Sequence, residues 1–345
     1  MKLVMTLLAR DEADIVDAQI AFHLSAGVDF IVATDNRSED GTTAILERYE
    51  RDGVLHLIRE PGDDLRQTEW VTRMARSAAT DFDADWVINT DADEFWWPQG
   101  TSLKDVFETV PFHFGVVRAA WRNFVPRPDG DAFFAERMTV RDCTPLFHPH
   151  PLTTHYKSAH RGVADVRVGR GNHEAFGTGL APVRGWFPIE ILHFPVRSLE
   201  HCRRKYVTQF VALEKNAEKG IAGHMADAYQ AYLEDALDDF YAPLVLDDAA
   251  LRRGLEAGTH AIDTRLRDRL RSLGFGDGAA GTADLAFGRR DAREAAAFAG
   301  EYSVLQDADL GLDLAARTTQ LERRIAALER RPLSRFRSAL GIDRL

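Results

Sequence analysis

The amino-acid sequence predicts an α/β fold, in which an open, mostly parallel sheet is flanked by helices and followed by a helical C-terminal extension. Two observations predict it. Apolar runs of strand length, such as residues 2–9 and 30–33, alternate with segments whose apolar residues recur at helical spacing. Continuous apolar runs are typical of strands that helices cover on both faces of a parallel sheet. The alternation therefore predicts strand-helix-strand crossovers.

The elements of the first hundred residues follow this alternation in order. Helices are predicted at residues 13–26, 42–51 and 65–79. Further strands are predicted at residues 54–58 and 85–90. The first helix should end at Gly27, because glycine adopts the left-handed conformation that closes many helices. These strands are expected to lie side by side in one parallel sheet.

The chain is predicted to have three parts. Residues 1–198 form the sheet domain, and shorter strands between about 110 and 195 complete its cleft. Residues 199–273 form a helical extension packed on that domain, with Ser198 as the cap of its first helix. Residues 274–345 begin as a linker rich in Gly and Ala and continue as a basic helical tail.

Composition restricts the partners and the location. The chain has 345 residues and a net charge of -11, which argues against nucleic acid as a partner because duplex-binding domains present a basic surface. Cys143 and Cys202 form no CxxC pair, so neither a disulfide framework nor a thiolate metal cluster is predicted. We see no signal peptide and no run of about 18 apolar residues, and therefore expect a cytoplasmic protein.

The C-terminal tail differs in charge from the rest of the chain. Residues 317–345 contain eight basic and three acidic residues. Apolar residues recur through this segment, at Leu321, Ile325, Leu328, Leu333, Phe336 and Leu340. A short helix of this kind is compatible with weak binding to an anionic membrane surface, which would make the protein peripheral to the inner face of the membrane. Self-association through the same apolar residues is the alternative.

Acidic side chains follow three of the predicted strands. Glu12 follows the first strand, Asp35 follows the second, and Asp91-Ala92-Asp93 follows the strand at 85–90. Open α/β sheets bind ligands beyond the carboxyl ends of their strands, at the point where the strand order reverses. The three acidic loops are therefore expected at one ligand-binding edge.

The spacing of Asp91 and Asp93 suits a divalent cation. Two carboxylates separated by one residue can hold Mg²⁺ or Mn²⁺ and leave positions open for phosphate oxygens. A cation on a diphosphate neutralises it and stabilises the leaving group. The spacing alone is not specific, because acidic residues in turns also cap helices. The position of the two carboxylates directly after a buried strand is what favours a metal site.

Three motifs together resemble glycosyltransferase family 2, of the GT-A fold, in its subgroup with a DADEF-type metal motif. They are ARDEADI at 9–15, AGVDFIVATDNRSEDGT at 26–42 and INTDADEFW at 88–96. The resemblance implies transfer of a sugar, mostly with inversion, from a nucleotide-diphosphate sugar to a hydroxyl of a glycan, a lipid-linked or another acceptor. It also implies Mn²⁺ or Mg²⁺ as the cofactor. Asp11 stands where relatives often carry Asn.

The resemblance implies roles for individual residues. Contacts to the nucleotide sugar would come from Ala9, Glu12, Asp35, Arg66, Gln67, Asp91, Lys157 and Arg161. Asp93 would coordinate the metal directly and be central to catalysis, and Asp91 would face the ribose or a metal-bound water. His193 fits the role of a third metal ligand, with a buried structural histidine as its alternative. For Lys157 and Arg161, the alternative to contact with the diphosphate is an ordinary position on the protein surface.

The group that deprotonates the acceptor hydroxyl is not distinguished by the sequence. An inverting transfer needs such a base, and the candidates by position are Glu174, Glu190 and His173, with Glu174 preferred. The basic run Arg203-Arg204-Lys205 is predicted to be a solvated face of the helical extension.

Three other functions have less support in the sequence. A nucleotidyltransferase would normally carry a Gly-rich phosphate loop after the first strand, where this chain has Ala9-Arg10-Asp11-Glu12. A non-catalytic sugar-nucleotide binding or assembly protein is the second alternative, and the intact Asp91 and Asp93 argue against it. A dinucleotide-dependent oxidoreductase is excluded because GxGxxG is missing after every early strand.

Overall fold

The computed structural model describes residues 1–62, 66–128, 130–143, 156–214 and 223–277, together with Phe287 and short stretches between 306 and 326. Most of the predicted linker and basic tail, including everything beyond residue 326, lies outside these residues. No helix among the described residues is long and apolar enough to cross a membrane.

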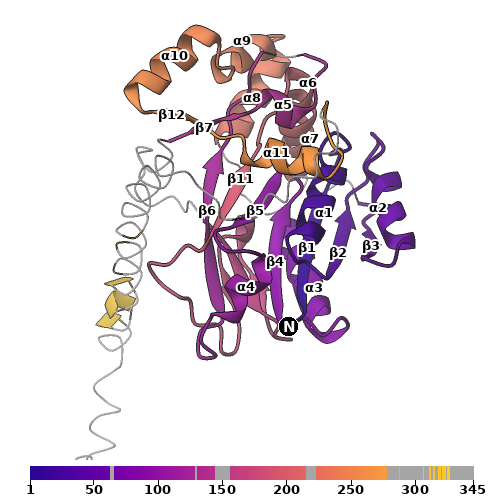
Figure 1. Ribbon diagram of the computed structural model, residues 1–345, viewed down its shortest axis with the longest axis vertical. Helices are drawn as coiled ribbons and strands as arrows, with labels where there is room; N and C mark the ends of the chain where they lie inside the picture. Colours follow the sequence, from indigo (N-terminus) through magenta and orange to yellow (C-terminus); the bar gives the residue numbers. More distant parts are fainter. Residues whose placement is uncertain are drawn as a thin grey trace, which may run out of the picture.

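A mixed, mostly parallel sheet of eight strands forms the centre of the molecule, with helices around it (Figure 1). The strand order is β3-β2-β1-β4-β8-β6-β11-β5. Its strands are β1 (Leu3–Ala9), β2 (Phe30–Asp35), β3 (Leu55–Arg59), β4 (Trp86–Asp91), β5 (Glu94–Pro98), β6 (Val116–Asn123), β8 (Tyr156–Arg161) and β11 (Ile189–His193). The β3-β2-β1-β4 half is parallel, whereas β8 is antiparallel to both its neighbours and β5 is antiparallel to β11. The predicted fold class is confirmed.

Helices cover both faces of the sheet because successive residues of a strand point to opposite faces and are apolar on each of them. In β1, Leu3, Met5 and Leu7 belong to one core cluster and Val4 to another. The first cluster includes residues of α1 (Val16–Ser25), α2 (Thr42–Arg51) and α4 (Leu103–Glu108), and the second includes residues of α3 (Gln67–Thr80). Gly27 has a positive φ of 109° after α1, as its predicted role as a helix terminator requires.

The C-terminal helices gather at one end of the sheet (Figure 1). These elements are α6 (Leu199–Cys202), the π-helical turn η3 (Arg203–Val207), α7 (Thr208–Glu214), α8 (Gly223–Leu233), α9 (Leu237–Tyr241), η4 (Ala242–Leu244), α10 (Asp248–Ala257) and α11 (Arg265–Ser272). The Ser198 hydroxyl accepts a hydrogen bond from the amide of His201 at 3.1 Å, which confirms the predicted cap.

Short elements connect this helical part to the sheet. They are α5 (Phe134–Arg137), β7 (Val140–Asp142), β9 (Arg167–Val168), η2 (Arg170–Asn172), β10 (Ala175–Phe176) and β12 (His260–Ile262). β12 pairs antiparallel with β7, and Leu266 and Leu270 of α11 join the main core. The predicted helical segment 199–273 therefore contains one strand and contributes side chains to the sheet domain.

Candidate functional site

The strand ends meet where the strand order of the sheet reverses. β1 lies between β2 and β4, with Ala9 of β1 opposite Asp35 and Leu8 opposite Asp91. Three of the predicted site residues therefore lie on neighbouring strand ends, at the position where open α/β sheets bind ligands.

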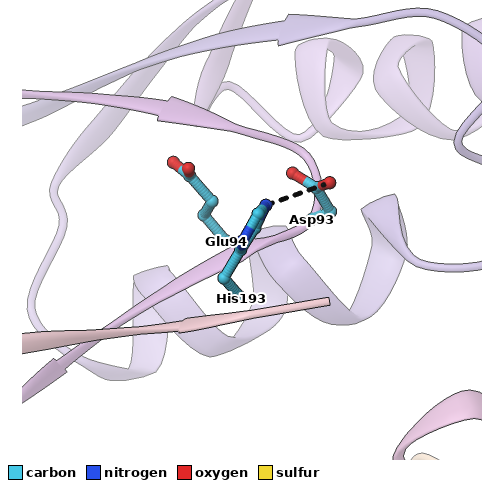
Figure 2. A group of neighbouring side chains, drawn as sticks. All are labelled: Asp93, Glu94 and His193. Atoms are coloured by element: carbon cyan, nitrogen blue, oxygen red, sulfur yellow. Dashed lines mark ion pairs between the residues drawn. The ribbon is translucent and has the colours of Figure 1, made fainter. Parts of the chain in front are cut away.

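The turn between β4 and β5 presents a group with metal-ligating atoms. One ligand atom each of Asp93, Glu94 and His193 lies within 4.8 Å of the others. His193 ends β11, which pairs antiparallel with β5 so that His193 stands opposite Glu94. Figure 2 shows the His193 imidazole directed toward the Asp93 carboxylate, with His193 Nε2 3.5 Å from Asp93 Oδ2. Asp91 is outside this group of three.

The orientation of His193 fits a metal ligand. Its Nδ1 lies 2.7 Å from Asn123 Oδ1 at the end of β6. Because the amide oxygen of Asn123 accepts, Nδ1 is the nitrogen that donates to it, and Nε2 is the nitrogen that faces Asp93 and could bind a cation. The ring also stacks on Trp121 at a centroid distance of 5.0 Å. A donor set of carboxylate oxygen and imidazole nitrogen suits Mn²⁺, so the residues fit the expected cation.

Lys157 of β8 neutralises the two carboxylates that flank Ala92 and Asp93. Its Nζ lies 2.5 Å from Asp91 Oδ2 and 2.6 Å from Glu94 Oε1. The indole of Trp121 donates a further hydrogen bond to Glu94 at 3.2 Å. Burial raises the pKa of Glu94 to about 7, against the opposite effect of Lys157. Lys157 is therefore a buried part of the site and not an ordinary surface lysine.

Lys205, on the π-helical turn η3, pairs with the carboxylate of Asp93. Its ammonium forms a close ion pair with Asp93 Oδ2 and donates a hydrogen bond to the Pro195 carbonyl at 3.1 Å. Burial by itself would raise the pKa of Asp93, but the charge of Lys205 lowers that pKa well below its usual range. The prediction that Arg203-Arg204-Lys205 forms a solvated face is wrong for Lys205, which pairs with a buried carboxylate.

Glu12 lies in a second buried ionic group beside the first. Arg197, almost fully buried, pairs with Glu12 and forms hydrogen bonds of 2.6 and 2.8 Å with Asp14. Burial acts to raise the pKa of Glu12, and Arg197 reverses the shift and lowers it. His201 Nε2 lies 3.7 Å from the same carboxylate. Glu12 is thus engaged within the protein at the edge of the site.

A small pocket joins the two ionic groups. It is lined by Arg10, Asp11, Glu12, His201, Arg204, Lys205 and Thr208. Its walls come from the loop after β1 and from the α6-η3-α7 segment, so residues about 190 positions apart in the chain face one another across it.

Asp35 organises the loop that follows β2. Its carboxylate accepts hydrogen bonds from the amide and hydroxyl of Ser38, at 3.0 and 2.6 Å, and from the Thr43 hydroxyl at 2.5 Å. Gln67, at the start of α3, lies 3.4 Å from Asp91 through its amide nitrogen. The neighbouring Arg66 is half exposed and forms a 3.8 Å ion pair with Glu69.

Other predicted residues lie farther from this group. The Arg161 side chain stacks on Trp86 and donates hydrogen bonds to the carbonyls of Phe114 and Val110. In the sheet, Arg161 lies opposite Trp86, the first residue of β4, and therefore at the other end of that strand from Asp91. Glu190 is buried in ion pairs with Arg122 and Arg265, both at 2.8 Å.

The two remaining base candidates follow η2. His173 contacts the edge of Trp121 at 5.3 Å and places Nδ1 2.7 Å from the Tyr156 carbonyl. Glu174 is exposed, and its neighbour Asn172 reaches Asp91 at 3.4 Å. Glu174 therefore lies in a segment that borders the site.

Sequence reasoning missed four residues that the structure places in the site. They are Glu94, Asn123, Arg197 and Lys205. A signal existed for Lys205, because it follows Cys202 by three residues and precedes Tyr206, two apolar residues at helical spacing. Nothing in the local sequence marks Asn123, whose partner lies 70 positions away.

The chain is similar to several solved structures at low sequence identity. No family model matches the chain, and no curated protein matches it. Among solved structures, Staphylococcus aureus TarS 1–349 with UDP-GlcNAc is 12% identical, covering 91% of this chain and 92% of that chain with a TM-score of 0.39. Mannosyltransferase PcManGT from Pyrobaculum calidifontis, with GDP-Man and Mn²⁺, is 16% identical, covering 93% and 87% with a TM-score of 0.36.

A third match has a shorter overlap. Glucosyl-3-phosphoglycerate synthase from Mycobacterium tuberculosis, in complex with Mn²⁺, UDP and phosphoglyceric acid, is 14% identical. The overlap covers 68% of this chain and 78% of that chain, with a TM-score of 0.33.

Proposed function

We propose that this protein is a divalent-cation-dependent glycosyltransferase that moves a sugar from a nucleotide-diphosphate donor to an acceptor hydroxyl. The observation that carries the proposal is the pairing of Asp93 with an oriented His193 at the carboxyl end of β4, beside the reversal of strand order. A cation-binding pair at this edge suits a ligand that carries a diphosphate.

Asp93 and His193 would hold the cation, Mn²⁺ or Mg²⁺. When bound, the cation would neutralise the diphosphate and stabilise it as a leaving group. Asp91 is the third expected ligand, and its present partners Lys157, Gln67 and Asn172 hold its carboxylate at the same edge. Glu94 supports the group from within the sheet, because Lys157 and Trp121 both bind its Oε1.

The nucleotide is assigned to the ends of β1 and β2. Ala9 and Asp35 stand side by side there, Glu12 follows in the next loop, and Arg66 and Gln67 begin α3 nearby. In this proposal Asp35 binds the base, and its contacts with Ser38 and Thr43 hold its carboxylate in place. Arg161, at the far end of β8, is the nucleotide-binding assignment with the least geometric support.

The proposed reaction inverts the anomeric centre, which rests on the family resemblance. Glu174 is the proposed base, because it is exposed beside Asn172 and His173, which contact Asp91 and Trp121. The acceptor is proposed as a glycan, lipid-linked or other hydroxyl compound. We retain weak membrane contact or self-association for the C-terminal tail as part of the proposal.

Hydrolysis of nucleotide sugars tests the proposal directly. UDP- and GDP-sugars would first be screened for thermal stabilisation with Mn²⁺, and the best donor used for the release of nucleoside diphosphate. We expect release to need the cation and to fall more than about a hundredfold in Asp93→Asn, beyond the loss typical of outer partners of a metal site. Asp81→Asn, on the surface at the end of α3, is the matched control.

Circular dichroism would check that both variants fold. Full activity in excess chelator, or in Asp93→Asn, would contradict the proposal. Release of pyrophosphate from a nucleoside triphosphate, with no hydrolysis of nucleotide sugars, would favour a nucleotidyltransferase instead.

A further inference from the structure

Lys205 and the expected cation compete for the same oxygen atom. The Lys205 ammonium pairs with Asp93 Oδ2, and His193 Nε2 approaches that same Oδ2 at 3.5 Å. A cation held by Asp93 and His193 would sit about 2 Å from this oxygen, within a few ångströms of the ammonium. Two positive charges at such a separation repel strongly in a partly buried site.

The position of Lys205 allows it to leave. Its side chain is 15% exposed, whereas the Lys157 side chain is 2% exposed. Besides its pair with Asp93, the Lys205 ammonium donates to the Pro195 carbonyl, and the side chain borders the pocket that Arg10 and Arg204 also line. A long flexible stem can carry the ammonium into that pocket without moving the backbone.

The local helix geometry singles out the same residue. η3 is one π-helical turn between α6 and α7, and Lys205 is its central residue. Single π turns inside helices are frequent at functional sites. Here it accompanies a lysine that pairs with a carboxylate of the sheet domain.

We propose that Lys205 is an internal cation that occupies Asp93 in the ligand-free protein and is displaced when a divalent cation binds. The displaced ammonium moves into the pocket lined by Arg10 and Arg204, where an anionic diphosphate would hold it. Binding of the cation and of the diphosphate are therefore coupled through Lys205. This inference rests on the proposed function for the nature of the diphosphate, but the exchange at Asp93 is testable with metal alone.

Titration of Mn²⁺ in the absence of any donor tests the exchange. Free Mn²⁺ would be followed by electron paramagnetic resonance with the wild type and Lys205→Met. The variant should bind Mn²⁺ at least about tenfold more tightly, since no ammonium has to be removed. Arg203→Met is the matched control, because Arg203 is exposed on the same turn and carries the same charge; its affinity should equal that of the wild type.

Two further measurements guard against misfolding of the variant. Lys205→Arg keeps the charge and should bind Mn²⁺ as the wild type does. In the wild type, Mn²⁺ should increase labelling of Lys205 by an amine reagent several-fold, measured by mass spectrometry. Labelling of Lys104, which pairs with Asp29 away from the site, should not change.

The outcomes separate this inference from the proposed function. Equal Mn²⁺ affinities of the wild type and Lys205→Met, or unchanged labelling of Lys205, would overturn the exchange. Tighter Mn²⁺ binding by the variant, in a protein that hydrolyses no nucleotide sugar, would support the exchange and contradict the glycosyltransferase. Absence of Mn²⁺ binding in both proteins would overturn both.

Discussion

Two lysines pair with the acidic turn after β4, and two different regions of the molecule supply them. Lys157 belongs to β8, a strand paired on both sides, and its ammonium is enclosed by Asp91, Glu94 and the face of Trp121. Lys205 belongs to a π-helical turn of the C-terminal helices and lies at the border of a pocket. The sheet thus holds one counter-charge permanently, and the helical region provides one that a ligand can replace.

The largest expected difference concerns the free energy of unfolding. Lys157→Met leaves the buried Glu94 and the partly exposed Asp91 without their ammonium, so we expect a loss of about 3 to 5 kcal/mol, mostly through Glu94. Lys205→Met also leaves a buried carboxylate, but one fixed Mn²⁺ concentration, about a hundred times the dissociation constant of this variant, should restore about 2.7 kcal/mol to it. The same concentration should restore less to Lys157→Met, in which the Lys205 ammonium still occupies Asp93. Urea unfolding of both variants, with and without Mn²⁺, measures this. Equal recovery in the two variants would remove the distinction between the lysines.

A smaller effect is expected where β6 supports the cation site. Asn123→Ala removes the acceptor for His193 Nδ1 and frees the ring to rotate or change tautomer. Loss of such a partner typically weakens metal binding by about 10- to 100-fold. Mn²⁺ titration checks this, and Asn123→Asp, which keeps an acceptor oxygen, should bind nearly as the wild type does. If Asn123→Ala bound Mn²⁺ normally, His193 would be a structural histidine.

The nucleotide end of the site should respond independently of both lysines. Asp35→Ala should weaken binding of a nucleoside diphosphate by about 1 to 3 kcal/mol, the usual range for a buried donor that loses its partner. Calorimetry with UDP and GDP measures it. Thr43→Val removes a hydroxyl that donates to Asp35 but leaves the carboxylate, and is the control for loop distortion. An unchanged dissociation constant in Asp35→Ala would leave Asp35 as a loop cap.

The acidic side of the site could be predicted from the sequence, and most of the basic side could not. Strand length and apolar runs locate β1, β2 and β4, and the residues after a parallel strand necessarily reach one edge, so Asp35, Asp91 and Asp93 follow. The family resemblance, and not the pattern, pointed to Lys157. Arg197 and Lys205 approach Glu12 and Asp93 only through packing of the C-terminal helices on the sheet.

The order of strands shows the same limit. Alternating strands and helices predict the parallel half of the sheet, where each crossover is local. The positions of β8, β6, β11 and β5 depend on pairings between residues 36 to 99 positions apart, such as Ala120 opposite Tyr156 and Glu94 opposite His193. No local period encodes such pairings, so the placement of Glu94 opposite His193, and of Asn123 beside His193, could not be predicted.

The smallest expected effect lies in the ionic group that joins the two regions, in which Arg197, just before α6, binds Asp14 before α1. Burial would raise the pKa of Asp14, but Arg197 lowers it to about 2 from 3.8. A carboxyl whose pKa is lowered by folding stabilises the protein fully above its unfolded pKa, and this contribution is lost as the pH falls from about 4 to 2. The Asp14 side chain is 39% exposed, so solvent reduces the contribution to roughly 1 kcal/mol or less. We expect the wild type to be more stable than Asp14→Asn at pH 5, measured by urea unfolding, and this advantage to shrink by pH 2.5.

Glu12 titrates in both proteins, so the difference between their free energies of unfolding isolates the contribution of Asp14. If that difference stayed constant with pH, the Asp14 charge would not hold the two regions together.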